Sequence, residues 1–400
     1  MSLLLNQPNN QNLLIVFLFL VLCVGCTSQE SIDIPDHIKT LENLTVYTPE
    51  TDFLKEIQFK KEQVFGDSDD VLIGEIWDVA IGDSGQVFIA DSKEMNIKTY
   101  EPDGHLLNIV GRRGNGPGEL QEISGIQVKG NQLFVFDRNQ KIVIVFSDDL
   151  YSYDHSVTIT DNRESYDEIL DAYLANIYVR SNYTYLKEFS KSKIPENIND
   201  WDKFRGERLY YLLGEDGEII SDKLFEVPSG YQVLVPFEGR STGLPVEFYG
   251  KNLTQLSNDD HIYNAWSDDF LIKVYTPDGG YKQAFYYPFE KFPLDPATAF
   301  GEAGDDFIRE AVRSINFPET WPALNDLLID DENRLWVSTI VEDFEVYEWW
   351  VLENSGELIT KFTWPRNEPI EEIKNGYMYT RETDEETGLQ QVVRYRVEMN

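Results

Sequence analysis

In this 400-residue chain, Asp78, Asn325 and Asp326 carry side-chain oxygen atoms of the kind that a divalent cation binds, and they lie on strands predicted to be innermost around a central axis. Carboxylate and amide oxygens are ligands that calcium prefers in proteins. Because Asp78 is far from the other two in sequence, only a fold that brings all three to a common axis can assemble such a site. We expect no cofactor, with calcium at these residues as the alternative.

Other constellations that could bind or react are sparse. Arg112 and Arg113 form a cationic pair in a protein of net charge −37, so they are candidates for binding an anionic ligand. The glycine-rich segment around them, residues 111–119, lacks the strand, lysine and helix context of a phosphate-binding loop. The sequence shows no Ser-His-Asp order, paired-carboxylate motif or nucleophile elbow. It therefore predicts no catalytic residues and favours a binding protein, while leaving the enzyme question open.

The composition excludes several classes of partner and site. Acidic residues outnumber basic ones by 71 to 34 and are spread along the chain, so binding of nucleic acid through a basic surface is excluded. The four histidines are not paired at the spacing of zinc ligands. Both cysteines lie near the N-terminus, which leaves the rest of the chain without a disulfide framework.

With respect to oligomeric state, we expect the protein to be a monomer.

A repeated phrase indicates the elements that must position any site. GQVFIAD over residues 85–91 and NQLFVFD over 131–137 end in Asp91 and Asp137, roughly 45 residues apart. A four-stranded unit repeated at this distance is typical of a β-propeller, whose blades stack around an axis. Each aspartate ends a predicted second strand, where a carboxylate accepts backbone N–H groups and fixes the next turn.

The spacing of tight turns predicts the number of blades. Five turns that suit the joint between the outer two strands of a blade are Asp103-Gly104, Asp148-Asp149, Asp216-Gly217, Asp278-Gly279 and Ser355-Gly356. They predict blades over about 74–115, 120–165, 168–228, 250–288 and 322–366, with insertions near 187–205, 228–249 and 288–322. A sixth blade combines strands at 371–380 and 389–397 with the run 53–65. Five and seven blades are the alternatives.

The predicted fold class is therefore all-β: a six-bladed β-propeller of four-stranded antiparallel blades. Strands from the two termini close the ring, which removes free sheet edges. The one predicted helix covers residues 301–316, where apolar residues form a stripe and Asp305 and Asp306 lie in the first turn. This short helical insertion is either a structural brace or a lid over the central channel.

The N-terminus predicts a cellular address. Residues 13–25 form an apolar run that is short for a membrane span and suits a signal peptide. Val24-Gly25-Cys26 resembles the end of a bacterial lipobox, so residues 1–26 are predicted as a lipoprotein signal peptide with Cys26 as the lipidated residue. Residues 27–52 then form a flexible tether and 53–400 the propeller. A plain cleaved signal or a short anchor is the alternative, because Cys23 replaces the usual leucine and no lysine or arginine precedes the run.

The segment from Ile76 to Phe146 resembles NHL-type repeats. The resemblance rests on the two phrases and on the connecting sequence GRRGNGPGE over residues 111–119. It is closest to bacterial lipoproteins known only as six-bladed β-propeller proteins. That resemblance implies an outer-membrane lipoprotein that contacts the membrane through its lipid anchor and faces the periplasm or the cell surface. It does not imply an activity, because one propeller scaffold hosts binding, lyase, lactonase and sensor functions.

Two functional hypotheses follow from these observations. The first is a lipid-anchored cell-envelope propeller that acts as a binding scaffold for a protein or a small ligand. The alternative is a calcium-dependent propeller hydrolase or lyase, lactonase-like, with an acidic central channel. In that case Asp78, Asn325 and Asp326 are the candidate metal ligands.

Overall fold

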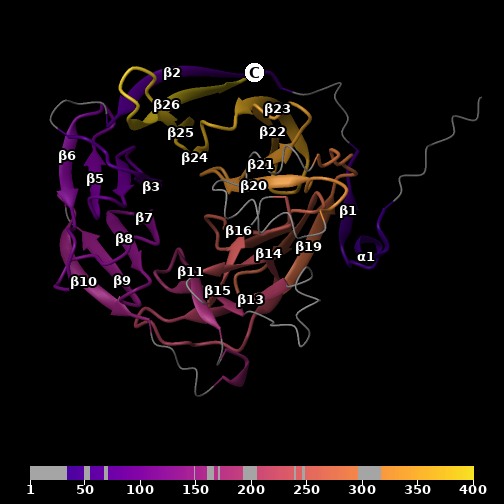
Figure 1. The fold of residues 1–400 in the computed structure, drawn as a ribbon, viewed down its shortest axis with the longest axis horizontal. Coiled ribbons are helices and arrows are strands. Elements are labelled where there is room, and N and C mark those ends of the chain that lie inside the picture. The colour runs from indigo at the N-terminus through magenta and orange to yellow at the C-terminus, as the bar shows by residue number, and fades with distance from the viewer. Residues whose placement is uncertain are drawn as a thin grey trace, which may run out of the picture.

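The strands of this protein form six antiparallel sheets arranged around one axis (Figure 1). In the computed structural model, the described residues are 34–48, 55–66, 71–147, 149–159, 166–169, 172–191, 205–237, 240–245, 248–295 and 317–400. The chain is a six-bladed β-propeller, and the predicted fold class is confirmed.

Each of the first five blades runs along the sequence from an innermost strand beside the axis to the rim. Blade 1 contains β3 (Ile76–Ile81), β4 (Val87–Asp91), β5 (Asn96–Tyr100) and β6 (Leu106–Val110). Blade 2 contains β7 (Gly125–Lys129), β8 (Gln132–Asp137), β9 (Ile142–Ser147) and β10 (Ser152–Thr158), and a short 3-10 helix, η2 (Asp167–Ile169), follows it. Blade 3 contains β11 (Tyr173–Val179), β12 (Tyr185–Lys191), β13 (Arg205–Leu213) and β14 (Phe225–Phe237), with β15 (Arg240–Pro245) as a fifth strand.

Blades 4 and 5 repeat the arrangement. Blade 4 contains β16 (Asn252–Leu256), β17 (Ile262–Trp266), β18 (Leu271–Tyr275) and β19 (Tyr281–Tyr286). Blade 5 contains β20 (Leu324–Ile329), β21 (Leu335–Ile340), β22 (Val346–Leu352) and β23 (Leu358–Pro365).

Blade 6 is built from two distant parts of the sequence. Its inner three strands are β24 (Ile370–Lys374), β25 (Tyr377–Thr383) and β26 (Gln390–Met399). The outermost strand is β2 (Ile57–Phe65), which pairs antiparallel with β26. The predicted ring closure is confirmed: a strand from the start of the propeller covers an edge that would otherwise be free.

Residues 34–48 pack on blade 4, although they lie in the segment expected to be a flexible tether. α1 (Asp36–Lys39) places Ile38 in the core, where it is 0% exposed. β1 (Leu44–Val46) pairs in parallel with β19 and makes blade 4 five-stranded. The apolar side chains of this segment gain burial against the sheet, which an exposed tether would forgo. The expected tether therefore does not include residues 34–48.

The core lies between neighbouring blades. Each of the six interfaces has its own cluster of buried apolar side chains. Aromatic residues contribute to these clusters: Phe270, Tyr287 and Trp350 contact one another between blades 4 and 5. Because no blade can bury its faces alone, the stacked ring is the unit of stability.

Asp91 and Asp137 are the turn anchors that the repeated phrase predicted. Both are 0% exposed at the ends of β4 and β8. Each carboxylate accepts an N–H group from the connection that enters its blade, from Gly74 and Gln121, in both cases at 2.7 Å. Each also accepts N–H groups from the turn after its own strand. The phrase is therefore a structural element of the blade.

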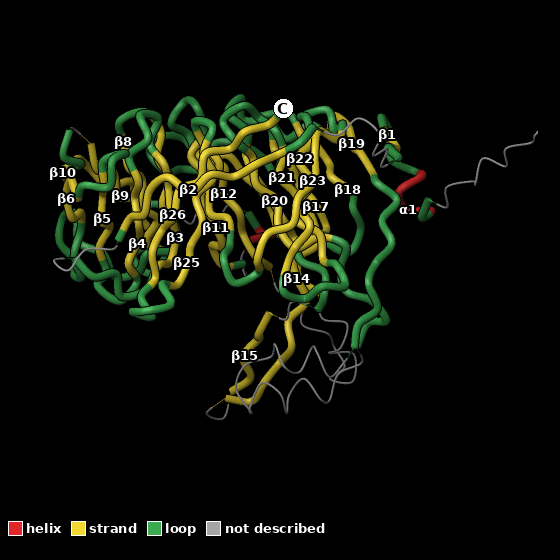
Figure 2. Tube along the Cα trace, turned by 90° about the horizontal axis from the view of Figure 1, so that it is seen from above, coloured by secondary structure: helices red, strands yellow, loops and turns green. Residues whose placement is uncertain are grey.

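The alternating direction of the strands sorts the connections onto two faces of the disc. Turns between the first and second strands of a blade lie on one face, which we call the turn face. Connections between the second and third strands, and from one blade to the next, lie on the other, which we call the insertion face. The expected insertions follow β12, β14 and β19, so they leave from the insertion face, where β14 and β15 extend beyond the disc (Figure 2).

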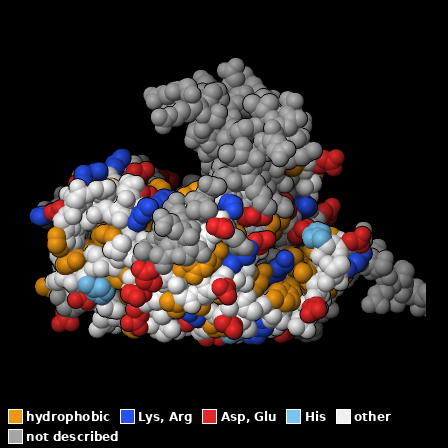
Figure 3. Space-filling model, turned by 90° about the horizontal axis from the view of Figure 1, so that it is seen from below, with side chains coloured by type: hydrophobic (Ala, Val, Ile, Leu, Met, Phe, Trp, Pro, Cys, Tyr) orange, Lys and Arg blue, Asp and Glu red, His pale blue; other side chains and the backbone are white. Residues whose placement is uncertain are grey.

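The insertions and the chain ends are only partly described. The predicted helix over 301–316 and the predicted lipidation site Cys26 both lie outside the described residues. Within the part of the chain that is described, no helix has the length and apolarity to cross a membrane. On the side of the molecule shown in Figure 3, acidic side chains are interspersed with basic and apolar ones, in agreement with their dispersal along the sequence.

Candidate functional site: the central channel

Four of the innermost strands share one local pattern: a buried apolar residue, an extra residue, a polar residue and a second buried apolar residue. At the extra residue the pairing with the second strand shifts register, which is a β-bulge. In a regular strand only alternate side chains share a face, so a bulge is needed to bury two apolar residues three positions apart. The four segments are Ile76–Val79, Leu174–Ile177, Leu324–Leu327 and Ile370–Ile373.

The polar residue of each bulge bonds to backbone nearby. Asp78, Asn176 and Asp326 each accept the N–H group of the residue that follows, at 2.9, 2.9 and 2.8 Å. These bonds compensate for the disrupted ladder at the bulge. In blade 6 the longer side chain of Glu372 accepts the N–H group of Ile81 on blade 1 instead, at 2.7 Å.

Other side chains of the innermost strands also join neighbouring blades. The second oxygen of Asp78 accepts the N–H group of Ile126 on blade 2, at 2.8 Å. The amide of Gln127 accepts the N–H group of Val179 at 2.8 Å and donates to the carbonyl of Ile177 at 2.7 Å, both on blade 3. Part of the polar lining around the axis is therefore structural.

A cavity of about 360 Å³ lies among these strands, and all six innermost strands contribute to its lining. Its charged lining residues include the carboxyl groups of Asp78, Glu371 and Glu372 and the ammonium groups of Lys129 and Lys374. Cavities that hold small organic molecules in proteins measure about 300–1,000 Å³. The central channel is therefore the candidate ligand site.

Three carboxyl groups that line the channel have raised pKa values. Burial raises the pKa of Asp78 to about 6, against the lowering effect of its backbone hydrogen bonds. Burial also raises the pKa of Glu371 and of Glu372 to about 7, although Arg381 lowers the former and Lys374 the latter. Repulsion from neighbouring carboxylates adds to the shift of both glutamates. Near neutral pH the channel therefore holds carboxyl groups close to their titration midpoints.

The two lysines of the channel differ in their partners. Nζ of Lys374 donates to the carbonyl of Ile81 at 2.9 Å and pairs with Asp83 at 2.8 Å. Nζ of Lys129 has no hydrogen-bond or ion-pair partner among the residues that the structure describes. Burial lowers the pKa of Lys129, and the nearby ammonium of Lys374 lowers it further, while surrounding carboxylates raise it. Lys129 is therefore a partly buried cation open to a ligand.

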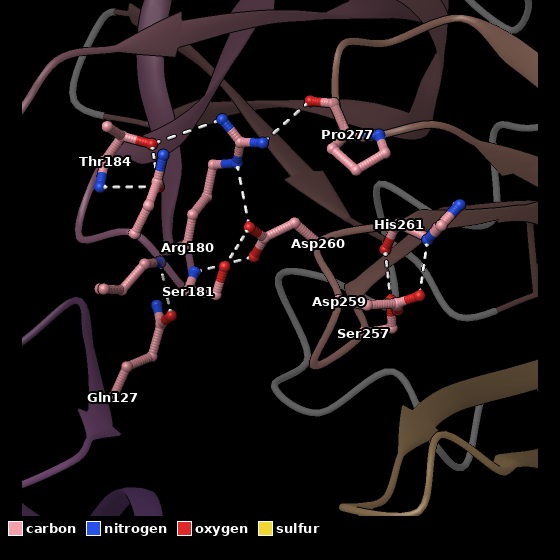
Figure 4. Close-up of polar contacts among 11 residues, drawn as sticks. Gln127, Arg180, Ser181, Thr184, Ser257, Asp259, Asp260, His261 and Pro277 are labelled. Atoms are coloured by element: carbon pink, nitrogen blue, oxygen red, sulfur yellow. Dashed lines mark hydrogen bonds and ion pairs between the residues drawn. The ribbon is translucent and has the colours of Figure 1, made fainter.

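On the turn face, Asp260 holds together the hairpin turns of blades 3 and 4 (Figure 4). Its carboxylate accepts the backbone N–H group and the hydroxyl of Ser181, at 2.8 and 2.6 Å, and lies 3.8 Å from Nε of Arg180. Arg180 also donates to the carbonyl of Pro277 at 3.1 Å and to the hydroxyl of Thr184 at 3.3 Å. The guanidinium group of Arg180 therefore already has partners within the protein and is not a candidate for binding a ligand.

Further turn-to-turn contacts continue around the channel mouth. The backbone N–H group of Asn258 on blade 4 donates to Asn333 on blade 5, at 2.9 Å. The backbone N–H group of Asn375 on blade 6 donates to Asp331 on blade 5, also at 2.9 Å. The ion pair of Lys374 and Asp83 joins blade 6 to blade 1. The short turn of blade 2 directly after Lys129 makes no hydrogen bond to a neighbouring turn within the described chain, so the ring is interrupted beside Lys129.

Ser257, Asp259 and His261 lie in one turn of blade 4 but are not arranged for nucleophilic catalysis (Figure 4). Oγ of Ser257 donates to Asp259 at 2.6 Å, and Nδ1 of His261 lies 2.9 Å from the same carboxylate. A catalytic serine needs the imidazole as its own hydrogen-bond partner. Here Nε2 of His261 lies 3.2 Å from Nζ of Lys282. This trio therefore gives no support to a serine hydrolase.

The predicted calcium ligands do not converge. Asp78 lines the cavity, whereas Asn325 and Asp326 are outside its lining. The amide oxygen of Asn325 lies 3.4 Å from Nζ of Lys251, and Asp78 and Asp326 accept backbone N–H groups. Within the described residues, no group of three or more His, Cys, Asp or Glu side chains has an arrangement that could hold a metal ion. These residues do not fit a calcium site, and we derive no reaction through one.

Arg112 and Arg113 do not reach the channel. They lie in the connection from blade 1 to blade 2, and Arg112, whose side chain is 80% exposed, pairs with Glu119 at 2.7 Å. Arg113 donates to the carbonyl of Lys93 at 3.4 Å. The structure therefore separates this pair from the carboxyl groups of the channel.

The charged lining residues missed from the sequence include Lys129, Glu371, Glu372 and Lys374. A usable signal was present for the two glutamates, because IEEI over 370–373 has the same bulge pattern as IWDV over 76–79. No comparable sequence pattern marks Lys129. Its availability to a ligand depends on the absence of a hydrogen bond, within the described chain, between the turn that follows it and a neighbouring turn.

Comparisons with known proteins support the fold. A family model described as 6-bladed beta-propeller (DUF5128) matches residues 67–198, which contain blades 1 and 2 and the first strands of blade 3. No curated protein matches the chain.

Solved structures with the same fold have low sequence identity. A candidate exported protein from Bacteroides fragilis has a TM-score of 0.50 and 12% identity, with 89% of this chain and 99% of that chain covered. A member of the duf4221 family from Bacteroides vulgatus has a TM-score of 0.51 and 8% identity, with 86% and 99% covered. These similarities show the propeller fold alone.

Proposed function

We propose that this protein is a cell-envelope binding protein that takes a small polar ligand into its central channel. The observation that carries the proposal is the cavity of about 360 Å³ on the propeller axis, lined by charged groups of both signs. The trio of Ser257, Asp259 and His261 lacks catalytic geometry, and the candidate metal ligands do not converge. Binding is therefore favoured over the calcium-dependent hydrolase or lyase.

A variant that fills the channel tests this proposal. Gly125 lines the cavity, and a Cβ atom at this position meets only an oxygen of Asp78, at 3.6 Å, without an unfavourable backbone angle. Gly125→Met is therefore expected to occupy the cavity while leaving the fold intact. We expect wild-type protein, incubated with an ultrafiltered extract of its source cells, to retain small molecules that Gly125→Met loses by at least about tenfold. Mass spectrometry of molecules released after gel filtration measures this.

Ser156→Met is the matched control, because Ser156 is exposed on β10 at the rim of the same blade. The control is expected to retain what the wild type retains. Equal retention by wild type and Gly125→Met would overturn the channel as the ligand site. Metal-dependent turnover of a lactone or a glycoside by purified protein would instead support the hydrolase or lyase.

We also propose that Cys26 anchors the protein by a lipid in the outer membrane, facing the periplasm or the cell surface, as a monomer. Support comes from the lipobox-like sequence Val24-Gly25-Cys26. Eight residue steps separate Cys26 from Ile34, which is the first described residue and precedes α1 on the rim of blade 4. A chain of this length spans at most about 28 Å, so the anchor would keep blade 4 near the bilayer.

Radiolabelled palmitate is expected to label the wild-type protein in cells and to leave Cys26→Ala unlabelled, because the Cys26 thiol is the site of lipid attachment. Cys23→Ala is the matched control and is expected to remain labelled. Fluorography after membrane fractionation measures both proteins. An unlabelled wild-type protein would support a plain cleaved signal or a short anchor, and labelling of Cys26→Ala would show that the lipid is attached to another residue.

A further inference from the structure

The channel carries its free charges at two levels along the axis. On β24, Glu372 and Lys374 are two residues apart, so both side chains leave the same side of the strand about 7 Å apart. Between blades 1 and 2, the carboxylate of Asp78 accepts the N–H group of Ile126, which precedes Lys129 by three residues on β7. In both places the lysine is nearer to the turn face than the carboxyl group.

Some of these charges are already compensated within the protein. Glu371 pairs with Arg381 at 2.9 Å, and Lys374 pairs with Asp83 at 2.8 Å. Asp78 and Glu372 accept only backbone N–H groups from the described residues, without an ion pair. Together with Lys129 they leave two carboxyl groups at one level and an ammonium group at the other, where the carboxylate of Asp331 also lines the cavity and accepts the N–H group of Asn375.

The position of Lys129 explains why its charge is available. The other inner turns bond to one another around the mouth, whereas the two-residue turn after Lys129 forms no such bond within the described chain. An ammonium group that is removed from water without a partner is costly. A ligand carboxylate placed at the turn-face end of the channel would offset that cost by forming a charge-assisted hydrogen bond.

Resting on the proposed function, we infer that the channel ligand is a zwitterion of the class of free amino acids and dipeptides. Its ammonium group lies between Asp78 and Glu372, and its carboxylate lies at Lys129. A ligand with only an anionic group meets the two carboxyl groups, and a ligand with only a cationic group leaves Lys129 without a partner. The zwitterion satisfies both levels of charge at once.

Calorimetry with three related probes tests this inference: L-alanyl-L-alanine, its N-acetyl derivative and its C-terminal amide. The free dipeptide is expected to bind wild-type protein at least about tenfold more tightly than either blocked form. Lys129→Met is expected to lose about tenfold in affinity for the free dipeptide and nothing for the amide, because the amide has no carboxylate for Lys129 to bind. Lys60→Met, which removes an exposed lysine on the rim strand β2, is the matched control and is expected to bind as the wild type does.

Two results would overturn the zwitterion. One is binding of a blocked dipeptide as tight as that of the free one, and the other is equal binding of the free dipeptide by wild type and Lys129→Met. Either result leaves the channel itself in place as long as Gly125→Met loses the molecules that the wild type retains. Equal retention by Gly125→Met and wild type removes the channel site, and the zwitterion with it.

Discussion

Replacing Asp91 with alanine is expected to lower the free energy of unfolding by about 3–5 kcal/mol. Asp91 is 0% exposed and Lys98 is 2% exposed, and their charged atoms lie 2.7 Å apart. Removing the carboxylate leaves the ammonium group of Lys98 buried without its charged partner. It also removes the acceptor for N–H groups of the connection before β3, including that of Gly74, and of the turn after β4, including that of Glu94. Chemical denaturation followed by tryptophan fluorescence measures the change.

The repeated phrase supplies a matched control for this prediction. Asp137 is equally buried and accepts comparable backbone bonds, but its side-chain partner is the neutral amide of Gln140 at 2.8 Å. Asp137→Ala is therefore expected to cost about 1–3 kcal/mol, which is the cost of unsatisfied buried groups without a stranded charge. The double variant Asp91→Ala, Lys98→Met is expected to recover part of the loss. Equal costs for the two aspartates would contradict the role assigned to Lys98.

Acidification from pH 8 to pH 5.5 is expected to stabilise the folded protein. The pKa of Asp78 is raised to about 6 and those of Glu371 and Glu372 to about 7 by burial. A carboxyl group with a raised pKa contributes stability that is fully present below its unfolded pKa and is lost as the pH rises through its folded pKa. Each pH unit over which only the folded state holds the proton is worth about 1.4 kcal/mol. For Glu372 this range covers about pH 5.5 to 7, so Glu372 alone accounts for about 2 kcal/mol between these limits.

Glu372→Gln tests the source of this pH dependence. A glutamine keeps the shape of the side chain and an oxygen that can accept the N–H group of Ile81, but it does not ionise. The variant is expected to be more stable than the wild type at pH 8 and about as stable at pH 5.5. Glu398→Gln, at an exposed position on β26, is the matched control and is expected to keep the wild-type profile. Thermal unfolding across the pH range measures all three proteins, and a wild-type slope in Glu372→Gln would contradict the assignment.

The architecture of the propeller could be predicted because its signals are local. Alternating apolar residues and turns such as Asp103-Gly104 and Ser355-Gly356 depend only on neighbouring positions, and the structure has these turns between the outer two strands of their blades. The closure by β2 could be predicted by counting strands, because the sixth blade was one strand short and the run at 53–65 was not assigned to any other blade. The packing of residues 34–48 on blade 4 could not be predicted, because it depends on an exposed edge of β19 that is distant in sequence.

The channel site could be predicted only in part. Asp78 was recognised as a polar residue on an innermost strand, and it does line the cavity. Asn325 and Asp326 were assigned on the same grounds but lie outside the lining, although Asp326 occupies the same bulge position in β20 that Asp78 occupies in β3. Residue type and position within the strand are the same for Asp78 and Asp326, so the sequence pattern alone could not show that only Asp78 lines the cavity.

By itself, the sequence indicated a propeller with six blades as the best count, and it predicted the way the ring closes and the structural role of Asp91 and Asp137. Those features depend on periodicity and turn chemistry, which each short segment carries on its own. Only the tertiary structure decided which charges meet in the channel and which remain without a partner. Lys129 is open to a ligand because, among the described residues, the turns of other blades bond to one another and not to the turn beside Lys129. Glu372 is a channel residue because blade 6 packs against blade 1, where Glu372 accepts the N–H group of Ile81. Both facts depend on contacts between distant segments, which no single segment of sequence records.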